Sequence, residues 1–418
     1  MIPKSGKQEW AALWPLPFTA MLGIAGASMF AYSSGIFMAS MTRELGWSRV
    51  EFSSAFSIMM LVGLVAMPFA GWLADRHGAR RIALIGIIPF ALAFSLFGLI
   101  RGALWQYWAL ALLTALCSAA IAPPMWITTV VENFKRSRGL ALAVALAGIG
   151  LASTVWPLLS AVYIDRIGWR LTFPVIAFTW AVPMFVITYF FFRAPGRAAP
   201  ATRHRRDGTQ SPSRAGFRKA LMSRTFLCLM IAGSLFSCCS YAISVHIVPL
   251  LAQRGFGLAA AAGIAGTAGL FSIIGRIGIG FLLDHVPTRV ISLIVFLVPI
   301  LVSALLWQSD RGMAFAVVAA ALFGISNGAE TDIIAYVAAR QFPRAMFASL
   351  YASVTAVVAV SASLGPLLAG AIYDATKSYD MFLLVVIPMA LVATFFAVLI
   401  PAGNSEVTTE DAEAAVIA

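Results

Sequence analysis

Charged residues are scarce in this sequence, at only 11% of its 418 positions. Soluble domains carry about 25% charged residues. Hydrophobic residues instead make up 61% of the chain, and its mean hydropathy is +0.90. A chain of this composition could not cover its apolar surface with polar groups in water. A soluble fold is therefore excluded, and a lipid bilayer is the expected environment.

Residue types that carry enzymatic, metal or nucleotide chemistry are also few. The four cysteines have no metal-ligand spacing, and the vicinal pair Cys238 and Cys239 is expected to be small apolar packing within a helix. His246 lies in an apolar stretch with neither a histidine–glutamate metal motif nor a serine–histidine set, and no G-x-x-x-x-G-K-S/T loop occurs. We therefore expect no enzyme, no bound metal or cofactor, and no ATP hydrolysis within this chain.

What the sequence does contain is long apolar runs. A transmembrane helix needs roughly 20 mostly apolar residues, whereas strands of a membrane barrel would show alternating segments of about ten. The runs here are long and continuous, so helices are predicted. The first run is too long for a signal-peptide core and is expected to be retained. Twelve predicted helices cover about residues 15–41, 52–74, 82–100, 104–131, 139–163, 170–192, 225–253, 258–283, 289–308, 313–338, 346–372 and 379–401.

Basic residues predict the orientation. With a cytoplasmic N-terminus, twenty of the 29 Lys and Arg residues fall in cytoplasmic segments and eight in outer loops, and the remaining one is Arg276. This bias places both termini in the cytoplasm and accounts for most of the net charge of +12, so nucleic acid is not an expected partner. The predicted division is a six-helix bundle (1–192), a Pro- and Arg-rich cytoplasmic linker (193–224), a second six-helix bundle (225–401) and an acidic, disordered tail (402–418). A lipid-headgroup role for the linker arginines is an alternative to simple solvation.

The two predicted bundles repeat each other at a shift of 209 residues. "GWLAD" at 71–75 aligns with "GFLLD" at 280–284, and "PLLSAVYID" at 157–165 aligns with "PLLAGAIYD" at 366–374. Matches at several equivalent loops and helix ends indicate a duplication of a six-helix unit. This arrangement is typical of alternating-access transporters, whose substrate site lies between the halves near the membrane midplane.

The first of these segments extends to "GWLADRHGARR" at 71–81, which resembles the loop motif between the second and third helices of the major facilitator superfamily. The resemblance implies an all-α membrane fold of twelve transmembrane helices in two pseudo-symmetric six-helix bundles. It also implies that this loop is an inner gate, with Gly71 allowing close helix packing and Asp75 engaging a helix end of the other bundle. The alternative is that the basic residues only set topology. The implied gate residues are Gly71, Asp75, Arg76, Arg80 and Arg81, with Asp284 and Arg289 as their counterparts in the second half.

Three further stretches resemble the monocarboxylate transporters and the oxalate:formate antiporter-like carriers. They are "ENFKRSRGLALAVALAGIG" at 132–150, "HIVPLLAQRGFG" at 246–257 and "GRIGIGFLLD" at 275–284. The arginine of the last stretch, Arg276, matches the eighth-helix arginine of that group. Departures are Ser272, where monocarboxylate transporters carry an aspartate, and the lack of their first-helix lysine and of the eleventh-helix lysine of oxalate carriers. A single buried cation favours one carboxylate over a dicarboxylate.

Four polar residues within predicted helices break the repeat. At the same shift of 209 residues, the first half has only uncharged residues at the equivalent positions. Met67, Phe37, Ile121 and Pro123 align with Arg276, His246, Glu330 and Asp332 respectively. A charge at bilayer depth costs at least about 2.5–3.5 kcal/mol, so it needs a partner or water. Arg276, Glu330 and Asp332 are predicted at similar depth. The two acids are about 200° apart around their helix, so only one of them is expected to face Arg276.

These residues predict a substrate site. Arg276 is expected to bind a carboxylate with its planar fork, the alternatives being that it snorkels to the interface or only pairs with a helix-ten acid. Glu330 or Asp332 is the expected proton carrier. His246 is expected near the outer mouth as an outer gate or substrate contact, the alternative being a packed polar residue. Other candidate contacts are Tyr32, Trp126, Trp156 and Tyr351, which would otherwise face lipid or the core.

The resulting hypothesis is a monomeric, multi-pass secondary transporter of the bacterial inner membrane. It would take up a small organic anion of the monocarboxylate type together with H⁺. The alternatives are an exporter or antiporter of a drug or sugar, or a transporter-like sensor that binds its ligand without moving it.

Overall fold

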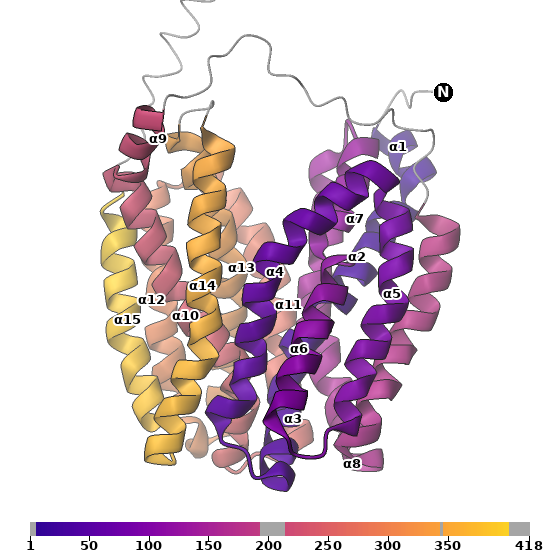
Figure 1. Ribbon diagram of the computed structural model, residues 1–418. Helices are drawn as coiled ribbons and strands as arrows, with labels where there is room; N and C mark the ends of the chain where they lie inside the picture. The colour runs from indigo at the N-terminus through magenta and orange to yellow at the C-terminus, as the bar shows by residue number, and fades with distance from the viewer. Residues whose placement is uncertain (1–5, 193–213, 343–345, 401–418) are drawn as a thin grey trace, which may run out of the picture.

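The computed structural model describes residues 6–192, 214–342 and 346–400, without the side chains of residues 6, 214–217, 284 and 348. Within these ranges the regular structure is helical (Figure 1). The first half contains α1 (Gly6–Leu13), α2 (Pro15–Ala27), α3 (Met29–Leu45), α4 (Arg49–His77), α5 (Ala79–Ser95), η1 (Leu96–Leu99), α6 (Leu104–Ala119), α7 (Pro123–Asn133) and α8 (Arg138–Phe191). The second half contains α9 (Arg214–Leu221), α10 (Arg224–Gln253), α11 (Leu258–His285), α12 (Thr288–Trp307), η2 (Ser309–Arg311), α13 (Met313–Gln341), α14 (Phe347–Thr376) and α15 (Asp380–Val398).

Eleven helical stretches of the described chain are long and apolar enough to cross a membrane. One of them, α8, has 54 residues and contains non-helical backbone at Gly168, with φ 76° and ψ 163°. A single crossing needs only about 20 residues. The two segments of α8 on either side of Gly168 are therefore two crossings, which confirms the predicted total of twelve. The predicted linker lies mostly outside the described residues, as does the tail, and the described end of the linker forms α9.

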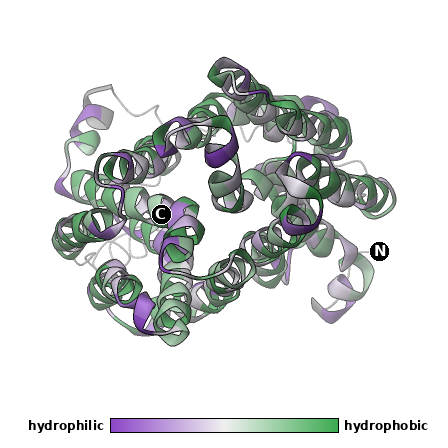
Figure 2. Cartoon of the chain, turned by 90° about the horizontal axis from the view of Figure 1, so that it is seen from below, coloured by the Kyte–Doolittle hydropathy of each residue, from purple (hydrophilic) through white to green (hydrophobic). Residues whose placement is uncertain are grey.

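Each half has its own apolar core. One cluster of buried residues is drawn almost entirely from α2–α8, and two further clusters are drawn almost entirely from α10–α15. Viewed along the helices, the chain forms two groups whose surfaces are dominated by hydrophobic residues (Figure 2). The glycines of α2 allow close packing, since a Cβ atom at Gly23 would lie 2.3 Å from the Trp126 ring and one at Gly26 would lie 1.8 Å from the Trp180 ring. Small residues at such contacts let membrane helices approach closely.

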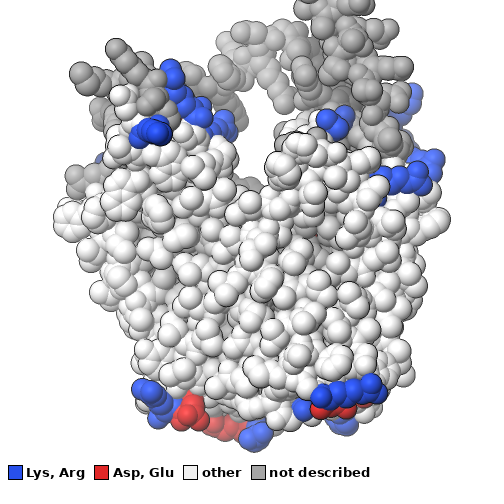
Figure 3. All heavy atoms as spheres, turned by 180° about the vertical axis from the view of Figure 1, so that it is seen from behind, with Lys and Arg blue, Asp and Glu red and all other residues white. Residues whose placement is uncertain are grey.

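The two halves meet along the helix pairs α3 with α10, α4 with α14, and α8 with α11. At the last pair, a Cβ atom at Gly269 would lie 2.4 Å from the Gly150 carbonyl oxygen, and the Thr154 hydroxyl donates to the Gly266 carbonyl at 3.0 Å. We call the end of the bundle near the N-terminus the N-terminal face. The halves diverge toward this face in both side views (Figures 1 and 3). On the surface shown in Figure 3, Lys and Arg lie there without Asp or Glu, whereas the opposite face carries both signs, as the positive-inside bias predicts.

At the N-terminal face, α1 is attached to the turn between α7 and α8 through Glu9. Its carboxylate accepts backbone N–H bonds from Lys135 at 2.8 Å, Arg136 at 3.1 Å and Ser137 at 2.9 Å. Burial alone would raise the pKa of Glu9, but these N–H groups stabilise the carboxylate and together hold its pKa below the usual value of 4.5. The contact is therefore charge-assisted.

The Glu9 contact should be lost in acid and weakened by Glu9→Gln. Because the folded-state pKa is lowered, the stabilisation is complete above pH 4.5 and disappears as the pH falls through the lowered pKa. Hydrogen bonds to a charged group contribute about 1.5–3 kcal/mol, so the neutral variant should show roughly tenfold lower amide protection at residues 135–137 at pH 7. Hydrogen-exchange protection factors measure this. Equal protection in both proteins at pH 7 would contradict the role of the charge.

Candidate functional site

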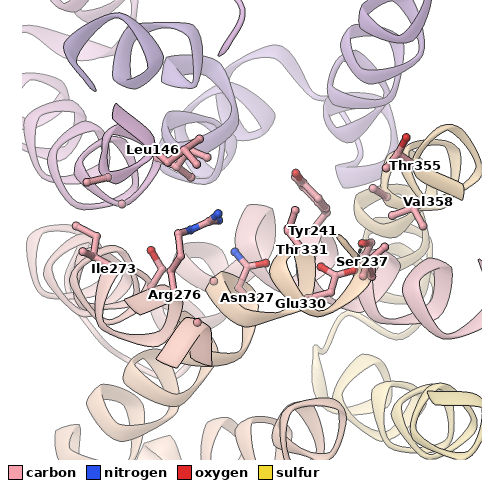
Figure 4. A pocket seen from close by; sticks show the side chains of 18 of the residues that line it. Leu146, Ser237, Tyr241, Ile273, Arg276, Asn327, Glu330, Thr331, Thr355 and Val358 are labelled. Atoms are coloured by element: carbon pink, nitrogen blue, oxygen red, sulfur yellow. Dashed lines mark hydrogen bonds between the residues drawn. The ribbon is translucent and has the colours of Figure 1, made fainter. Parts of the chain in front are cut away.

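A central cavity of about 440 Å³ lies between the two halves. Its walls come from α3, α4 and α8 of the first half and from α10, α11, α13 and α14 of the second half. Small residues of α8, including Ala143, Ala147 and Gly150, form one wall opposite the polar groups of α11 and α13. In Figure 4 the Arg276 side chain extends from α11 toward Leu146 across this space, while Glu330 and Ser237 lie on the other side of Asn327.

Arg276 carries the positive charge of the cavity. Its Nη1 atom lies 3.0 Å from Oδ1 of Asp332 on α13, and the two side chains remain 22% and 28% exposed. Arg276 therefore does not extend to the interface as a snorkelling residue would. A buried cation is stabilised by such a partner. The ion pair uses Nη1 of the guanidinium, and among the described residues the remaining N–H groups have no hydrogen-bond partner, so they can bind an anion in the cavity.

Glu330 faces a different helix from Asp332, as the helical spacing predicts. It is 5% exposed, and its carboxyl group accepts a hydrogen bond at 2.5 Å from the Ser237 hydroxyl of α10. Both Glu330 and Ser237 line the cavity. Among the described residues, Arg276 and Glu330 are therefore the charged residues that line the cavity, and Asp332 pairs with Arg276 without lining it.

Two tyrosines related by the internal repeat line the same cavity. Tyr32 on α3 and Tyr241 on α10 are separated by 209 residues and occupy equivalent positions of the two halves. Within the described part of the chain, neither phenol hydroxyl has a hydrogen-bond partner, and the same holds for the Asn327 amide. These groups are available to a bound molecule. Tyr241 and Asn327 were not predicted from the sequence, although the 209-residue repeat applied to Tyr32 leads to Tyr241.

The remaining predicted contacts divide into two groups. Tyr351 lines the cavity from α14. Trp126 and Trp156 do not line it, because their indoles are buried within the first half and donate to the carbonyls of Ile121 and Ala25 at 2.7 Å each. These two tryptophans are packing residues of the first bundle in this conformation.

His246 lies away from the cavity, at the closed end where the halves meet. It is fully buried, with Nε2 3.0 Å from the Pro366 carbonyl and 3.2 Å from the Ser53 hydroxyl of the first half. Its Nδ1 atom lies 2.8 Å from the Tyr379 hydroxyl. A carbonyl can only accept, so Nε2 carries a proton and, in the neutral ring, Nδ1 accepts from Tyr379. His246 thus connects the two halves and does not contact the cavity.

Next to His246, four residues form what we call the outer clamp: Arg49, Tyr373, Asp374 and Tyr379. The Asp374 carboxylate accepts the backbone N–H groups of Arg49 at 3.1 Å and Val50 at 2.9 Å, which are the first two residues of α4. The Arg49 guanidinium lies 3.3 Å from the centre of the Tyr373 ring and 4.7 Å from that of Tyr379, and it donates to the Tyr379 hydroxyl. The clamp therefore joins an acid of the second half to a helix N-terminus of the first half, which favours negative charge.

The predicted inner gate is open in this conformation. Asp75 is exposed, and within the described residues it has no hydrogen bond or ion pair. A Cβ atom at Gly71 would meet nothing within 4 Å, so the expected close packing at Gly71 is wrong for this conformation. Arg80 donates to the Tyr189 carbonyl at the end of α8, and Arg76 lies over the Trp72 ring. Arg81 and Arg289 are exposed, and the Asp284 side chain lies outside the described residues.

The chain matches the family described as Major Facilitator Superfamily over residues 20–329. It is 26% identical over 327 residues to an MFS-type transporter of Gibberella moniliformis, covering 77% of this chain and 73% of that protein. It is 24% identical to monocarboxylate transporter 13 of Rattus norvegicus, covering 84% and 82% of the two chains. Among solved structures, a variant of the nucleoside transporter NupG aligns with a TM-score of 0.75 at 12% identity, covering 93% of this chain and 99% of the other.

Proposed function

Since the chain belongs to the major facilitator superfamily, whose model spans most of it, we propose that this multi-pass membrane protein is a secondary transporter of a monocarboxylate anion, coupled to H⁺. It would work by alternating access, with both termini in the cytoplasm. The observation that carries the proposal is Arg276 in a cavity between the halves, with its ion-pair partner Asp332 beside it, both at positions that have no charged counterpart in the first half. The name of the rat relative, a monocarboxylate transporter, supports the same substrate class.

The charges of the cavity link anion binding to a proton. With Glu330 and Asp332 both ionised, the site has one more negative than positive charge and repels an anion. Protonation of Asp332 at Oδ1 would end its ion pair with Arg276 Nη1. The freed guanidinium could then bind a substrate carboxylate through two parallel N–H bonds. The substrate and the proton would cross together, because each stabilises the bound state of the other.

The described conformation has the opposite face closed and the cavity open toward the N-terminal face. Contacts of the outer clamp and of His246 hold the opposite face closed. With the predicted orientation, this is the inward-facing state. Release of substrate to the cytoplasm would occur from this state, and reloading would require the outer clamp to open and the inner gate around Asp75 to close.

An uptake screen tests the proposal. Purified protein in proteoliposomes would be offered radiolabelled monocarboxylates, a dicarboxylate, a sugar and a cationic drug, with and without an inward proton gradient. We expect accumulation of at least one monocarboxylate only with the gradient. Gradient-independent uptake of the sugar, or export of the drug without carboxylate uptake, would replace the proposal with one of the other transporter classes. Binding without movement of any compound would indicate a sensor.

Two carboxyl variants should shift the conformational equilibrium in opposite directions. Asp374→Asn weakens the charge-assisted cap on α4 and should lower the ratio of inward-facing to outward-facing protein roughly tenfold, or by about 1.4 kcal/mol. Asp75→Asn should raise this ratio, because Asp75 has no hydrogen bond or ion pair among the described residues in this state and is proposed to act only in the other. Spin labels would be attached at positions 101 and 311 in a background without native cysteines. The distance between them, measured by double electron–electron resonance, would report the opening of the opposite face. A longer distance in both variants, or in neither, would contradict the two gate assignments.

A further inference from the structure

A second cavity, of about 180 Å³, lies at the N-terminal face of the second half, where α12 begins and where α13 and α15 end. We call it the α12 pocket. Its lining includes Thr288, Arg289, Ser292, Tyr336, Arg340 and Ile400. It shares no lining residue with the central cavity, so it is a separate site.

Two arginines give the α12 pocket its charge. Within the residues that the structure describes, neither Arg289 nor Arg340 has an acidic partner. Arg340 is held in place by Tyr336, whose ring centre lies 4.9 Å from the guanidinium carbon and whose hydroxyl donates to the Leu283 carbonyl at 2.8 Å. Two guanidinium groups that line one pocket and have no acidic partner among the described residues are suited to bind phosphate oxygens.

The floor of the α12 pocket offers further donors. Ser292 is only 2% exposed and lines the pocket, yet its hydroxyl has no hydrogen-bond partner among the described residues. Helix α12 begins after Pro287 without a side-chain cap, and Pro287, Thr288 and Arg289 at this helix end line the same pocket. A helix N-terminus favours an anion. Because Ser292 lines the pocket, an oxyanion bound there would give its hydroxyl a partner.

The first half shows how the equivalent space is otherwise filled. Arg80, which corresponds to Arg289 at the 209-residue shift, donates to the carbonyls of Thr188 and Tyr189 at the end of α8. The equivalents of these two residues are Ala397 and Val398 at the end of α15. Arg289 makes no such bond, and Ala397 lines the α12 pocket instead. The second half thus leaves open a space that the first half closes with its own arginine.

We propose that the α12 pocket binds the phosphate group of an anionic phospholipid. The chemistry of the lining is that of a phosphate site, and its surroundings favour a lipid over a free phosphate ion. Val290, Leu293 and Ile294 on the first turns of α12 are 44%, 41% and 60% exposed, next to Arg289 and Ser292. These side chains would contact the acyl chains of a lipid whose headgroup occupies the pocket. Basic pockets between transmembrane helices at the cytoplasmic face are recognised sites for anionic headgroups.

Native mass spectrometry of the full chain tests the proposal with phosphatidylglycerol and phosphatidylcholine as probes. The unaltered protein should retain phosphatidylglycerol preferentially. The double variant Arg289→Gln, Arg340→Gln should bind it about tenfold more weakly, because both charged donors are lost. The matched control Lys135→Gln, Arg138→Gln removes two exposed charges from the same face of the first half and should bind it as the unaltered protein does.

Further measurements distinguish lipid binding from binding of a soluble anion, from a folding defect and from general attraction to basic residues. Millimolar inorganic phosphate should not displace the lipid, and displacement would assign the pocket to a soluble anion. Ser292→Ala, which keeps both charges, should weaken lipid binding by a smaller factor of about two to five. Thermal unfolding in detergent without anionic lipid should be the same for all variants, so that a folding defect is recognised. Equal loss of phosphatidylglycerol in the pocket variant and in the control would show only general attraction to basic residues and would overturn the proposal.

Discussion

Arg276→Gln is expected to abolish movement of monocarboxylates, lowering the counterflow rate at least about 100-fold, because two charge-assisted bonds to the carboxylate are lost. The variant leaves no cation in the central cavity while Asp332 and Glu330 remain. An anion would then enter a site that holds only carboxyl groups. Arg276→Lys keeps the charge but loses the planar fork, so it should weaken binding without removing transport. Counterflow of the best substrate from the uptake screen measures both effects.

The double variant Arg276→Gln, Asp332→Asn separates substrate binding from a structural role. If Arg276 served only to neutralise Asp332, removing both charges together should restore activity, because no unpaired buried charge would then remain. If Arg276 binds the carboxylate, the double variant stays inactive although its fold is relieved of an unpaired acid. Arg311→Gln, an exposed arginine at the opposite face, is the control for loss of charge and should leave counterflow unchanged. Full activity of Arg276→Gln would remove the carboxylate site altogether.

The sequence predicts the fold well because the solvent imposes it. Apolar runs of bilayer length leave helices as the expected structure, and even the unbroken α8 is recognisable as two crossings from its length and from Gly168. The charged part of the site was also predictable, since Arg276, Glu330 and Asp332 are the groups that the duplication does not explain. The helical spacing of the two acids correctly indicates that they face different helices.

Aromatic contacts and gates were less accessible to sequence reasoning. A mid-helix aromatic has no charge to satisfy, so nothing in the sequence separates cavity-lining Tyr351 from Trp126, which is packed against Gly23. The outer clamp joins Arg49 to Asp374, residues 325 positions apart, and we propose that it forms in only one state of the transport cycle. A motif indicates that a gate exists, but the state in which it closes depends on the relative position of two bundles. Asp75 shows this, since the conformation described leaves it without a partner.

Asp332 has a role that the resemblance assigns elsewhere. The monocarboxylate transporters carry an aspartate four residues before the arginine, and this chain has Ser272 at that position. Here the acid comes from α13 and reaches Arg276 across the helix pair at 3.0 Å. The same two charges are therefore present at the site, but on separate helices, because Asp332 pairs with Arg276 from α13. This arrangement leads us to propose Asp332, rather than Glu330, as the proton carrier.

Asp332→Asn is accordingly expected to separate exchange from accumulation. The amide mimics the protonated acid, so Arg276 stays free to bind a carboxylate and counterflow should remain within about threefold of the unaltered rate, a difference below 1 kcal/mol. Proton-driven accumulation should fall at least about tenfold, because no proton is exchanged at the ion pair during the cycle. Counterflow and gradient-driven uptake in proteoliposomes, measured on the same preparation, give the two values.

Glu330→Gln is the matched comparison. Glu330 lies in the same cavity at nearly the same depth, but its hydrogen bond goes to Ser237 and not to Arg276. An amide can still accept from that hydroxyl, so this variant should lose less accumulation than Asp332→Asn. If Glu330→Gln alone loses accumulation, the proton is carried by Glu330 and the ion pair is a fixed part of the anion site. If both variants lose counterflow and accumulation equally, the two acids act in binding or folding and neither is a separate proton carrier.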